Sequence, residues 1–236
     1  MTTNSADGAH GRAQNVSFPG GDGEAYGYLE LPPSGRGPGL VVVQEWWGLT
    51  DHIADLVRRF AAEGFVALAP DLYGGRTTHD PEEARRLLRQ LPVDRAARDL
   101  AGAVDLLLGH DAVTSPAVGA VGFCMGGGFA LALAAQQGER VGGVVPFYGL
   151  PPADTGYGHL RAQVQGHYAE KDRSISRDDV AAMTTKVRQQ AEIDAEIFWY
   201  PAGHAFVNDQ RPSYDPDSAR LAWSRAVAFL RRSLGR

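Results

Sequence analysis

The sequence contains a single cysteine, Cys124, among its 236 residues, and this scarcity excludes several kinds of protein. One cysteine cannot form a disulfide within the chain or supply a cysteine-rich zinc site, and it fits a reducing compartment. We expect no metal and no cofactor. Long apolar runs are missing too: no stretch approaches a membrane span, and residues 1–15 lack the apolar region of a secretory signal. We therefore expect a soluble, cytoplasmic protein.

A strong excess of charge of one sign is also missing. The 28 acidic and 23 basic residues give a formal net charge of −5, and the two signs alternate along the chain. Such a chain has no basic patch for nucleic acid or anionic membrane, so we expect neither as a partner. The 44% of hydrophobic residues can bury the core of one large domain. We expect a monomer or a weak homodimer.

Strand and helix patterns alternate over most of the chain. After a hairpin at 16–18 and 25–31, we predict strands at 40–45, 65–70, 118–123, 141–148, 164–168 and 193–200. Predicted helices lie between them, at 51–64, 81–89, 94–108, 129–135, 177–191 and 217–234. This alternation predicts an α/β fold with a doubly wound, mainly parallel sheet flanked by helices. We expect a disordered leader at 1–14 and a single domain at 15–236.

The stretch from Val118 to Ala130 is the centre of this arrangement, because it joins an apolar run, a glycine cluster and a second apolar run. Within it, Gly122-Phe-Cys-Met-Gly126 has the spacing of a nucleophile elbow, G-x-S-x-G, with cysteine in the serine position. The residues two before and two after a nucleophile on such a sharp turn crowd together, so glycine is needed at both. The pattern predicts Cys124 as a nucleophile.

Other interpretations exist for a glycine-rich turn between a strand and a helix. It could bind a phosphate, but Phe129-Ala130 stand where a P-loop needs Lys and Ser or Thr, and the spacing is not G-x-G-x-x-G. Alternatively, Cys124 could be a small buried core residue, as free cysteines usually are. A cysteine nucleophile needs a base and an orienting acid, so the choice depends on finding these partners.

Seven histidines are candidates for the base, and one stands out by its position. His204 follows the last predicted strand and a Pro-Ala-Gly turn, and it precedes the last helix, which is where an elbow hydrolase carries its base. Of the other six, His52 is better explained as a helix cap and His167 as a structural partner. The remaining four are better explained as surface residues: His10, His79, His110 and His159.

The acid is expected between the nucleophile and the histidine, just after a strand. Asp172 follows the strand that ends at Tyr168, with Glu170 and Asp154 as alternatives. In an α/β sheet, active residues lie beyond the carboxyl ends of the strands, and Cys124, Asp172 and His204 all satisfy this rule. We therefore predict a Cys–His–Asp triad.

Glu45 ends the predicted strand at 40–45, beside the expected elbow, and Trp46-Trp47 follow it. A lone glutamate at a strand end is usually solvated, but a carboxylate in this loop would face Cys124. The same loop supplies the second oxyanion-hole N–H in elbow hydrolases. We therefore assign the backbone N–H groups of Trp46 and Met125 to the oxyanion hole, and Glu45 is a further candidate residue of the site.

Five segments together resemble the dienelactone hydrolase family, from about Tyr26 to the C-terminus. They are Gln44-Glu-Trp-Trp-Gly-Leu49, Ala69-Pro-Asp-Leu-Tyr73, Gly122-Phe-Cys-Met-Gly-Gly127, Ala169-Glu-Lys-Asp172 and Ala202-Gly-His-Ala-Phe206. The resemblance implies an α/β-hydrolase fold and ester or lactone hydrolysis by the triad of Cys124, His204 and Asp172. It also implies that Glu45 is a catalytic residue, which holds the resting thiol until substrate binding releases the sulfur to His204.

The chain departs from the dienelactone-cleaving members at two positions. Those members grip the substrate carboxylate with two arginines, and the matching residues here are Pro81 and Asn208, which carry no charge. Nearby arginines could substitute, namely Arg76, Arg85 or Arg211, although each would ordinarily be a solvated surface residue. We expect the substrate to contact Trp47, Arg76 and Tyr148.

These predictions together favour hydrolysis of an activated carboxylic ester or an enol lactone through a thioester on Cys124. A thiol leaves a tetrahedral intermediate more readily than a simple alkoxide, so amides and plain alkyl esters should be poor substrates. Two alternatives stay open: a non-catalytic small-molecule-binding protein on a hydrolase scaffold, and a thiol redox sensor. The redox sensor would lack a resolving cysteine within the chain.

Overall fold

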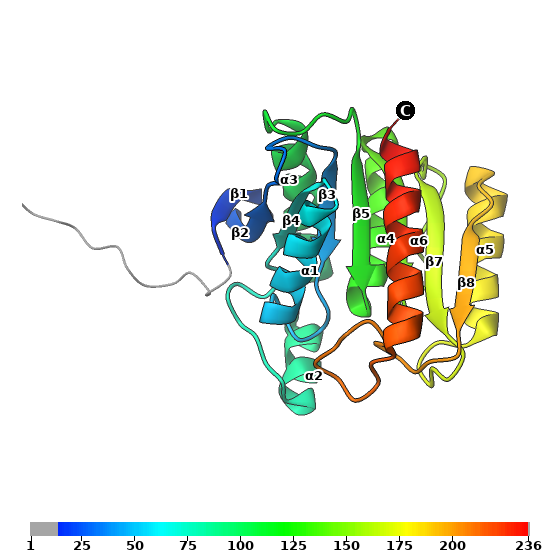
Figure 1. Cartoon of the computed structure of the whole chain (residues 1–236). Coiled ribbons are helices and arrows are strands. Elements are labelled where there is room, and N and C mark those ends of the chain that lie inside the picture. Colours follow the sequence, from blue (N-terminus) through cyan, green and yellow to red (C-terminus); the bar gives the residue numbers. More distant parts are fainter. Residues whose placement is uncertain (1–13, 236) are drawn as a thin grey trace, which may run out of the picture.

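An eight-stranded sheet runs through the part of the chain that the computed structural model describes, residues 14–235 (Figure 1). The strands lie in the order β1-β2-β4-β3-β5-β6-β7-β8. Two antiparallel strands form one edge, β1 (Val16–Gly20) and β2 (Gly23–Glu30). The other six are parallel: β3 (Gly39–Val43), β4 (Val66–Pro70), β5 (Val118–Phe123), β6 (Val141–Phe147), β7 (Gln163–Ala169) and β8 (Glu196–Tyr200). The predicted mainly parallel, doubly wound sheet is confirmed.

Helices cover both faces of the sheet. One face, in front in Figure 1, carries α1 (Asp51–Ala62) and α6 (Pro216–Leu234). The other face carries α2 (Pro81–Gln90), α3 (Val93–Leu108), α4 (Met125–Gln137) with the short 3-10 turn η1 (Gly138–Arg140), and α5 (Arg177–Ala191). A separate buried core results on each side. Strands β3, β4 and β5 are buried throughout, which explains their near-continuous apolar sequences.

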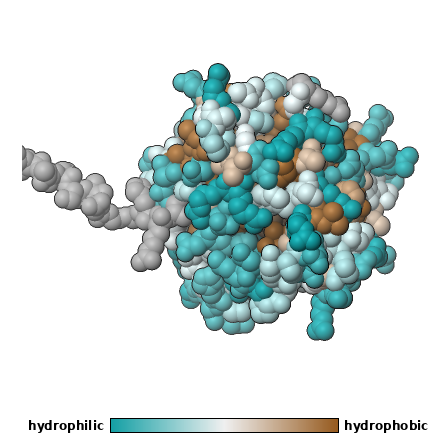
Figure 2. All heavy atoms as spheres, in the orientation of Figure 1, coloured by the Kyte–Doolittle hydropathy of each residue, from teal (hydrophilic) through white to brown (hydrophobic). Residues whose placement is uncertain are grey.

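The last helix shows how the apolar pattern decides which face is buried. Val227, Leu230 and Leu234 are buried against the sheet, and Trp223 packs beside them on the ring of Phe60. These residues form the apolar stripe by which α6 packs on the sheet. Hydrophilic side chains dominate the outward face of α1 and α6, with only small apolar patches between them (Figure 2).

Two boundaries differ from the prediction by more than about two residues. The helix expected to begin at Phe129 begins at Met125, because the glycines of the elbow form its first turn and let it press against neighbouring backbone. The strand expected from residue 193 begins at Glu196, because Glu192 ends α5 in the left-handed conformation and the chain then needs a short connection to the sheet.

Of the predicted leader, residues 1–13 lie outside the described part of the chain. Gln14 lies within it, and its side-chain amide donates a hydrogen bond of 2.5 Å to Oδ2 of Asp71. None of the helices in residues 14–235 is both long and apolar enough to span a membrane.

Candidate active site

Cys124 stands on the sharp turn between β5 and α4. Its φ of 55° and ψ of −122° are strained for a residue with a side chain, at a cost of about 1–3 kcal/mol. A Cβ atom on Gly122 would overlap the carbonyl of Gly126, and one on Gly126 would overlap the carbonyls of Val43 and Gln44. The predicted need for glycine on both sides of the cysteine therefore has a steric cause. The same close contact presses the elbow against the loop that follows β3.

His204 and Asp172 meet just beyond the ends of β8 and β7. Nδ1 of His204 lies 2.6 Å from Oδ2 of Asp172, and the backbone N–H of Ser174 donates to Oδ1 of Asp172 at 2.7 Å. Burial acts to raise the pKa of Asp172, but the hydrogen bonds from His204 and Ser174 outweigh it and hold that pKa below its usual range. Asp172 is thus an anion that fixes the orientation of the imidazole.

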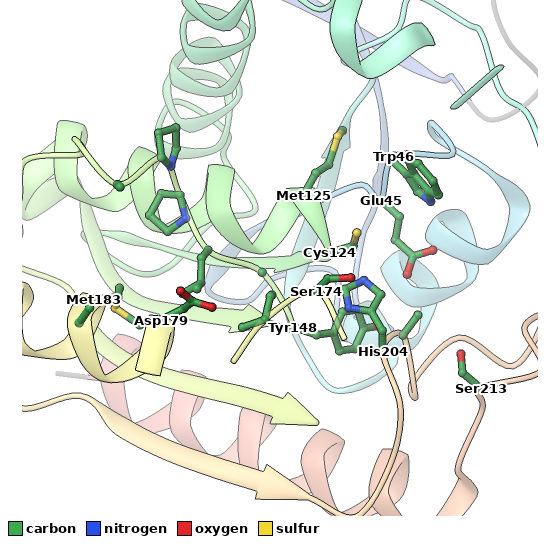
Figure 3. A pocket seen from close by; sticks show the side chains of 18 of the residues that line it. Glu45, Trp46, Cys124, Met125, Tyr148, Ser174, Asp179, Met183, His204 and Ser213 are labelled. Carbon is green, nitrogen blue, oxygen red and sulfur yellow. The ribbon is translucent and has the colours of Figure 1, made fainter. Parts of the chain in front are cut away.

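Cys124 is the second neighbour that acts on the imidazole of His204. Burial acts to lower the pKa of His204, but hydrogen bonds and charge interactions with Asp172 and Cys124 raise it to about 10. The nucleophile, base and acid expected from their positions along the chain are therefore neighbours in space. Figure 3 shows His204 beside Cys124, with the Glu45 carboxylate close to both.

Glu45 is a buried carboxylate with only one hydrogen-bonded oxygen. Nδ2 of Asn208 donates to Oε2 at 2.7 Å, while Oε1 has no hydrogen-bond partner in the described part of the protein. Burial raises the pKa of Glu45 to about 7, although Asn208 and the charges of His204 and Arg211 act to lower it. The structure therefore places Glu45 beside the triad, and its expected hold on the resting thiol stays a prediction.

The predicted oxyanion hole has its two residues in suitable places. Met125 is the first residue of α4, where backbone N–H groups have no partner within the helix, and Trp46 lies in the loop held against Gly126. That loop is fastened to the next one, because the Leu72 N–H donates to Oε1 of Gln44 at 3.2 Å. Both Trp46 and Met125 line the same cavity as Cys124. Their role as donors stays a prediction.

A cavity of about 960 Å³ opens over the cysteine (Figure 3). Seven of the predicted site residues line it: Glu45, Trp46, Trp47, Cys124, Met125, Tyr148 and His204. Asp172 lies behind His204 and does not line the cavity, as suits a residue that acts through the imidazole. No cluster of His, Cys, Asp and Glu suitable for a metal ion is found within residues 14–235.

The expected substrate contacts have different outcomes. Tyr148 and Trp47 line the cavity, and the Tyr148 ring lies 5.2 Å from the His204 ring, on a backbone with a φ of 38°. Arg76 does not line the cavity, because its guanidinium is turned to Glu83, 3.0 Å away. The structure thus gives no support to the prediction that Arg76 contacts the substrate.

Sequence reasoning missed the use of two residues near Glu45. Asn208 was notable only for lacking a charge, yet its amide is the hydrogen-bond partner of Glu45, and its own Oδ1 accepts from the Gln210 N–H at 3.0 Å. Arg211 was one of three arginines named as possible substitutes, with a surface position as the ordinary expectation, and it lines the cavity, with its guanidinium carbon 3.6 Å from the centre of the Trp47 ring. Neither contact leaves a local pattern in the sequence.

Two of the other histidines are buried, for structural reasons. His167 bonds to Tyr200 and Gln165, and burial lowers its pKa to about 3, so the prediction of a structural partner is confirmed. His52 was expected to cap α1, but Thr50 occupies the capping position, and Nδ1 of His52 lies 3.4 Å from Asp209.

Comparison with known proteins gives a consistent result. The model of the dienelactone hydrolase family matches residues 25–234. Protein usf of Aquifex pyrophilus is 34% identical, over 94% of this chain and 99% of its own. A protein of Aquifex aeolicus, provisionally named a carboxymethylenebutenolidase, is 32% identical over 94% of this chain and 99% of its own.

A solved structure from Klebsiella pneumoniae agrees with this result. It is provisionally named a dienelactone hydrolase, and it superposes with a TM-score of 0.81 at 32% identity, over 91% of this chain and 96% of its own. The sheet of this chain, flanked by helices in one domain, is accordingly an α/β-hydrolase fold. With its matching fold and family model, the chain belongs to the dienelactone hydrolase family and is a carboxylic ester hydrolase.

Proposed function

We propose that the protein hydrolyses activated carboxylic esters or enol lactones through a thioester on Cys124. The observation that carries the proposal is the pair of His204 and Asp172, 2.6 Å apart, beside a cysteine on a strained elbow. Nδ1 of the imidazole is occupied by the carboxylate, so its second nitrogen is left for the sulfur. Cys124, His204 and Asp172 are the proposed nucleophile, base and orienting acid.

The first half of the reaction transfers the acyl group to the enzyme. The Cys124 sulfur attacks the substrate carbonyl as its proton passes to His204, and the carbonyl oxygen becomes an anion. The backbone N–H groups of Trp46 and Met125 stabilise this anion. The intermediate then expels the alcohol or enol oxygen, which takes the proton from His204. In a lactone, that oxygen stays attached to the acyl chain.

The second half returns the enzyme to its starting state. His204 removes a proton from water, the hydroxide attacks the thioester carbonyl, and the Cys124 sulfur departs and is reprotonated. The carboxylic acid leaves, and no cofactor takes part. We assign to Glu45 the role of accepting a hydrogen bond from the resting thiol, which keeps the sulfur protonated and resistant to oxidation between turnovers.

The use of sulfur limits the substrates. A thiol has a pKa of about 8.5, so the tetrahedral intermediate expels sulfur in preference to a simple alkoxide or an amine. Only a stabilised leaving group, such as an enolate or a phenolate, competes with it. Dienelactone itself would find no arginine at the two expected positions. Pro81 is the first residue of α2, and the Asn208 amide donates to Glu45. Arg211 also lines the cavity, and its charge acts on Glu45.

The test is turnover of p-nitrophenyl acetate by the wild-type protein and by Cys124→Ala and Cys124→Ser variants, with intact-mass analysis of rapidly quenched samples. We expect an acetyl adduct on Cys124 in the wild type and loss of turnover in the alanine variant. The anilide analogue should react far more slowly, because its leaving group is an amine. Turnover by Cys124→Ala at the wild-type rate would refute the mechanism.

A further inference from the structure

The cavity extends from Cys124 in two directions that differ in chemistry. Figure 3 shows Asp179 and Met183 on one side of the cysteine, and Ser213 beyond His204 on the other. With about 960 Å³, the cavity is at the upper end of the range of about 300–1,000 Å³ that holds drug-sized ligands. A small lactone would leave most of this space empty.

The side towards Met183 is walled by apolar residues, and we name it the apolar arm. Its walls come from the connection after β6, from α5 and from Ile175, two residues before that helix: Leu150, Pro151, Tyr157, Ile175, Ala182 and Met183. Tyr157 and Met183 are almost fully buried, which fixes the shape of the arm's inner wall. Ala182 is exposed at its rim.

Two charged residues line the same arm, but both are occupied. The Asp179 carboxylate accepts from the backbone N–H and the hydroxyl of Ser176, at 2.9 and 2.6 Å, and thereby caps α5. Nζ of Lys186 donates to the Ala153 carbonyl at 2.9 Å and lies 6.0 Å from the Tyr157 ring. With both charges engaged in local structure, the arm is suited to an apolar group.

The position of the base decides which part of an ester lies there. The leaving oxygen takes its proton from His204, so the alcohol or enol portion must lie on the His204 side of the sulfur. The acyl carbon is bonded to the sulfur, and its chain extends away from His204, towards Met183. We infer that the apolar arm is an acyl-binding site that selects esters of medium-length, unbranched or aryl-substituted carboxylic acids.

This inference rests on the proposed function and specifies its substrate class. Each added methylene buried in the arm should raise kcat/KM about fourfold, because burial of one CH₂ favours binding by about that factor. p-Nitrophenyl acetate, butyrate and octanoate therefore form a direct test, with kcat/KM expected to rise through the series.

A matched pair of variants on α5 tests the location. Ala181 and Ala182 are adjacent and both exposed, but only Ala182 lines the cavity. Ala182→Trp should lower the octanoate-to-acetate ratio of kcat/KM at least tenfold, while Ala181→Trp should leave that ratio as in the wild type. A flat or falling series in an enzyme whose activity requires Cys124 overturns the inference and leaves the proposed function intact.

Two further measurements test the direction in which the ester lies in the cavity, and test binding in the arm independently of ester hydrolysis. If Ala182→Trp acts instead on acetates of phenols that carry longer alkyl chains, the arm holds the leaving group and the inference is overturned. Binding of octanamide and butanamide to the Cys124→Ala variant gives a measurement that needs no turnover. We expect octanamide to bind at least tenfold more tightly, and to lose that advantage in the Ala182→Trp background. Equal binding of the two amides would overturn the inference even if the ester activity is confirmed.

Discussion

Replacement of Glu45 by Gln should make the protein more stable, and by an amount that depends on pH. Glu45 is fully buried, one of its oxygens has no hydrogen-bond partner in the described structure, and burial raises its pKa from 4.5 to about 7. The folded state binds the proton of this carboxyl group more tightly than the unfolded state does. The bound proton therefore adds to the free energy of unfolding at low pH. That contribution is complete below about pH 4.5 and is lost as the pH rises through about 7.

The magnitude follows from the difference between the two pKa values. About 2.5 units at 1.36 kcal/mol each correspond to about 3 kcal/mol of stability lost by about pH 8, and to less than about 1 kcal/mol at pH 5. Glutamine has the shape of the protonated glutamate and can still accept from Asn208, but it never ionises. The Glu45→Gln variant should therefore exceed the wild type by about 3 kcal/mol at pH 8 and by less than about 1 kcal/mol at pH 5.

Urea unfolding followed by tryptophan fluorescence, at pH 5 and pH 8, measures this difference. Glu82→Gln is the control, because the Glu82 side chain is 80% exposed and its substitution should change stability by less than about 0.5 kcal/mol at either pH. An equal gain at both pH values, or a loss of stability at pH 8, would refute the argument that Glu45 is held in the site against the cost of burying its charge.

Two other substitutions test the triad and the elbow. Asp172→Asn should lower kcat for p-nitrophenyl acetate by about 10⁴-fold with an unchanged circular dichroism spectrum, because the imidazole loses its orienting anion. Proton NMR should show the pKa of His204 falling from about 10 towards its ordinary value, and a loss of kcat below tenfold would contradict the triad. Gly126→Ala should cost about 3 kcal/mol of stability or more, because its Cβ would overlap the Gln44 carbonyl. Gly156→Ala meets nothing within 4 Å and should be close to neutral, so equal effects of the two in urea unfolding would contradict the steric argument.

The parts of the site that were predictable are those that local chain geometry requires. The elbow is encoded in consecutive residues, because the crowding of Gly122 against Gly126 is a property of the turn itself. Asp172 and His204 could be placed because a parallel sheet brings the carboxyl ends of its strands to one edge. The contact of Asn208 with Glu45 joins residues 163 positions apart, and no local pattern reports it.

The rest of the cavity could not be predicted for the same reason, because it depends on contacts between residues far apart in the sequence. Arg211 looks like any surface arginine in the sequence, and only the fold brings it over the Trp47 ring. The apolar arm is invisible for a related reason, since Ala182 and Met183 read as ordinary positions of an amphipathic helix. Likewise, the start of α4 at Met125 depends on how closely the helix approaches β3, which no propensity for glycine reveals.

The features that lower the stability of the fold lie close together, around the candidate active site. Of the four described residues other than glycine with a positive φ, three line the cavity, namely Cys124, Tyr148 and Ala205, while Glu192 ends a helix. Each such backbone costs about 1–3 kcal/mol, and the buried Glu45 adds a similar amount at neutral pH. A chain selected for stability alone would relieve these costs. Their coincidence around one sulfur supports the covalent chemistry proposed for Cys124, because a binding scaffold without chemistry would not need it.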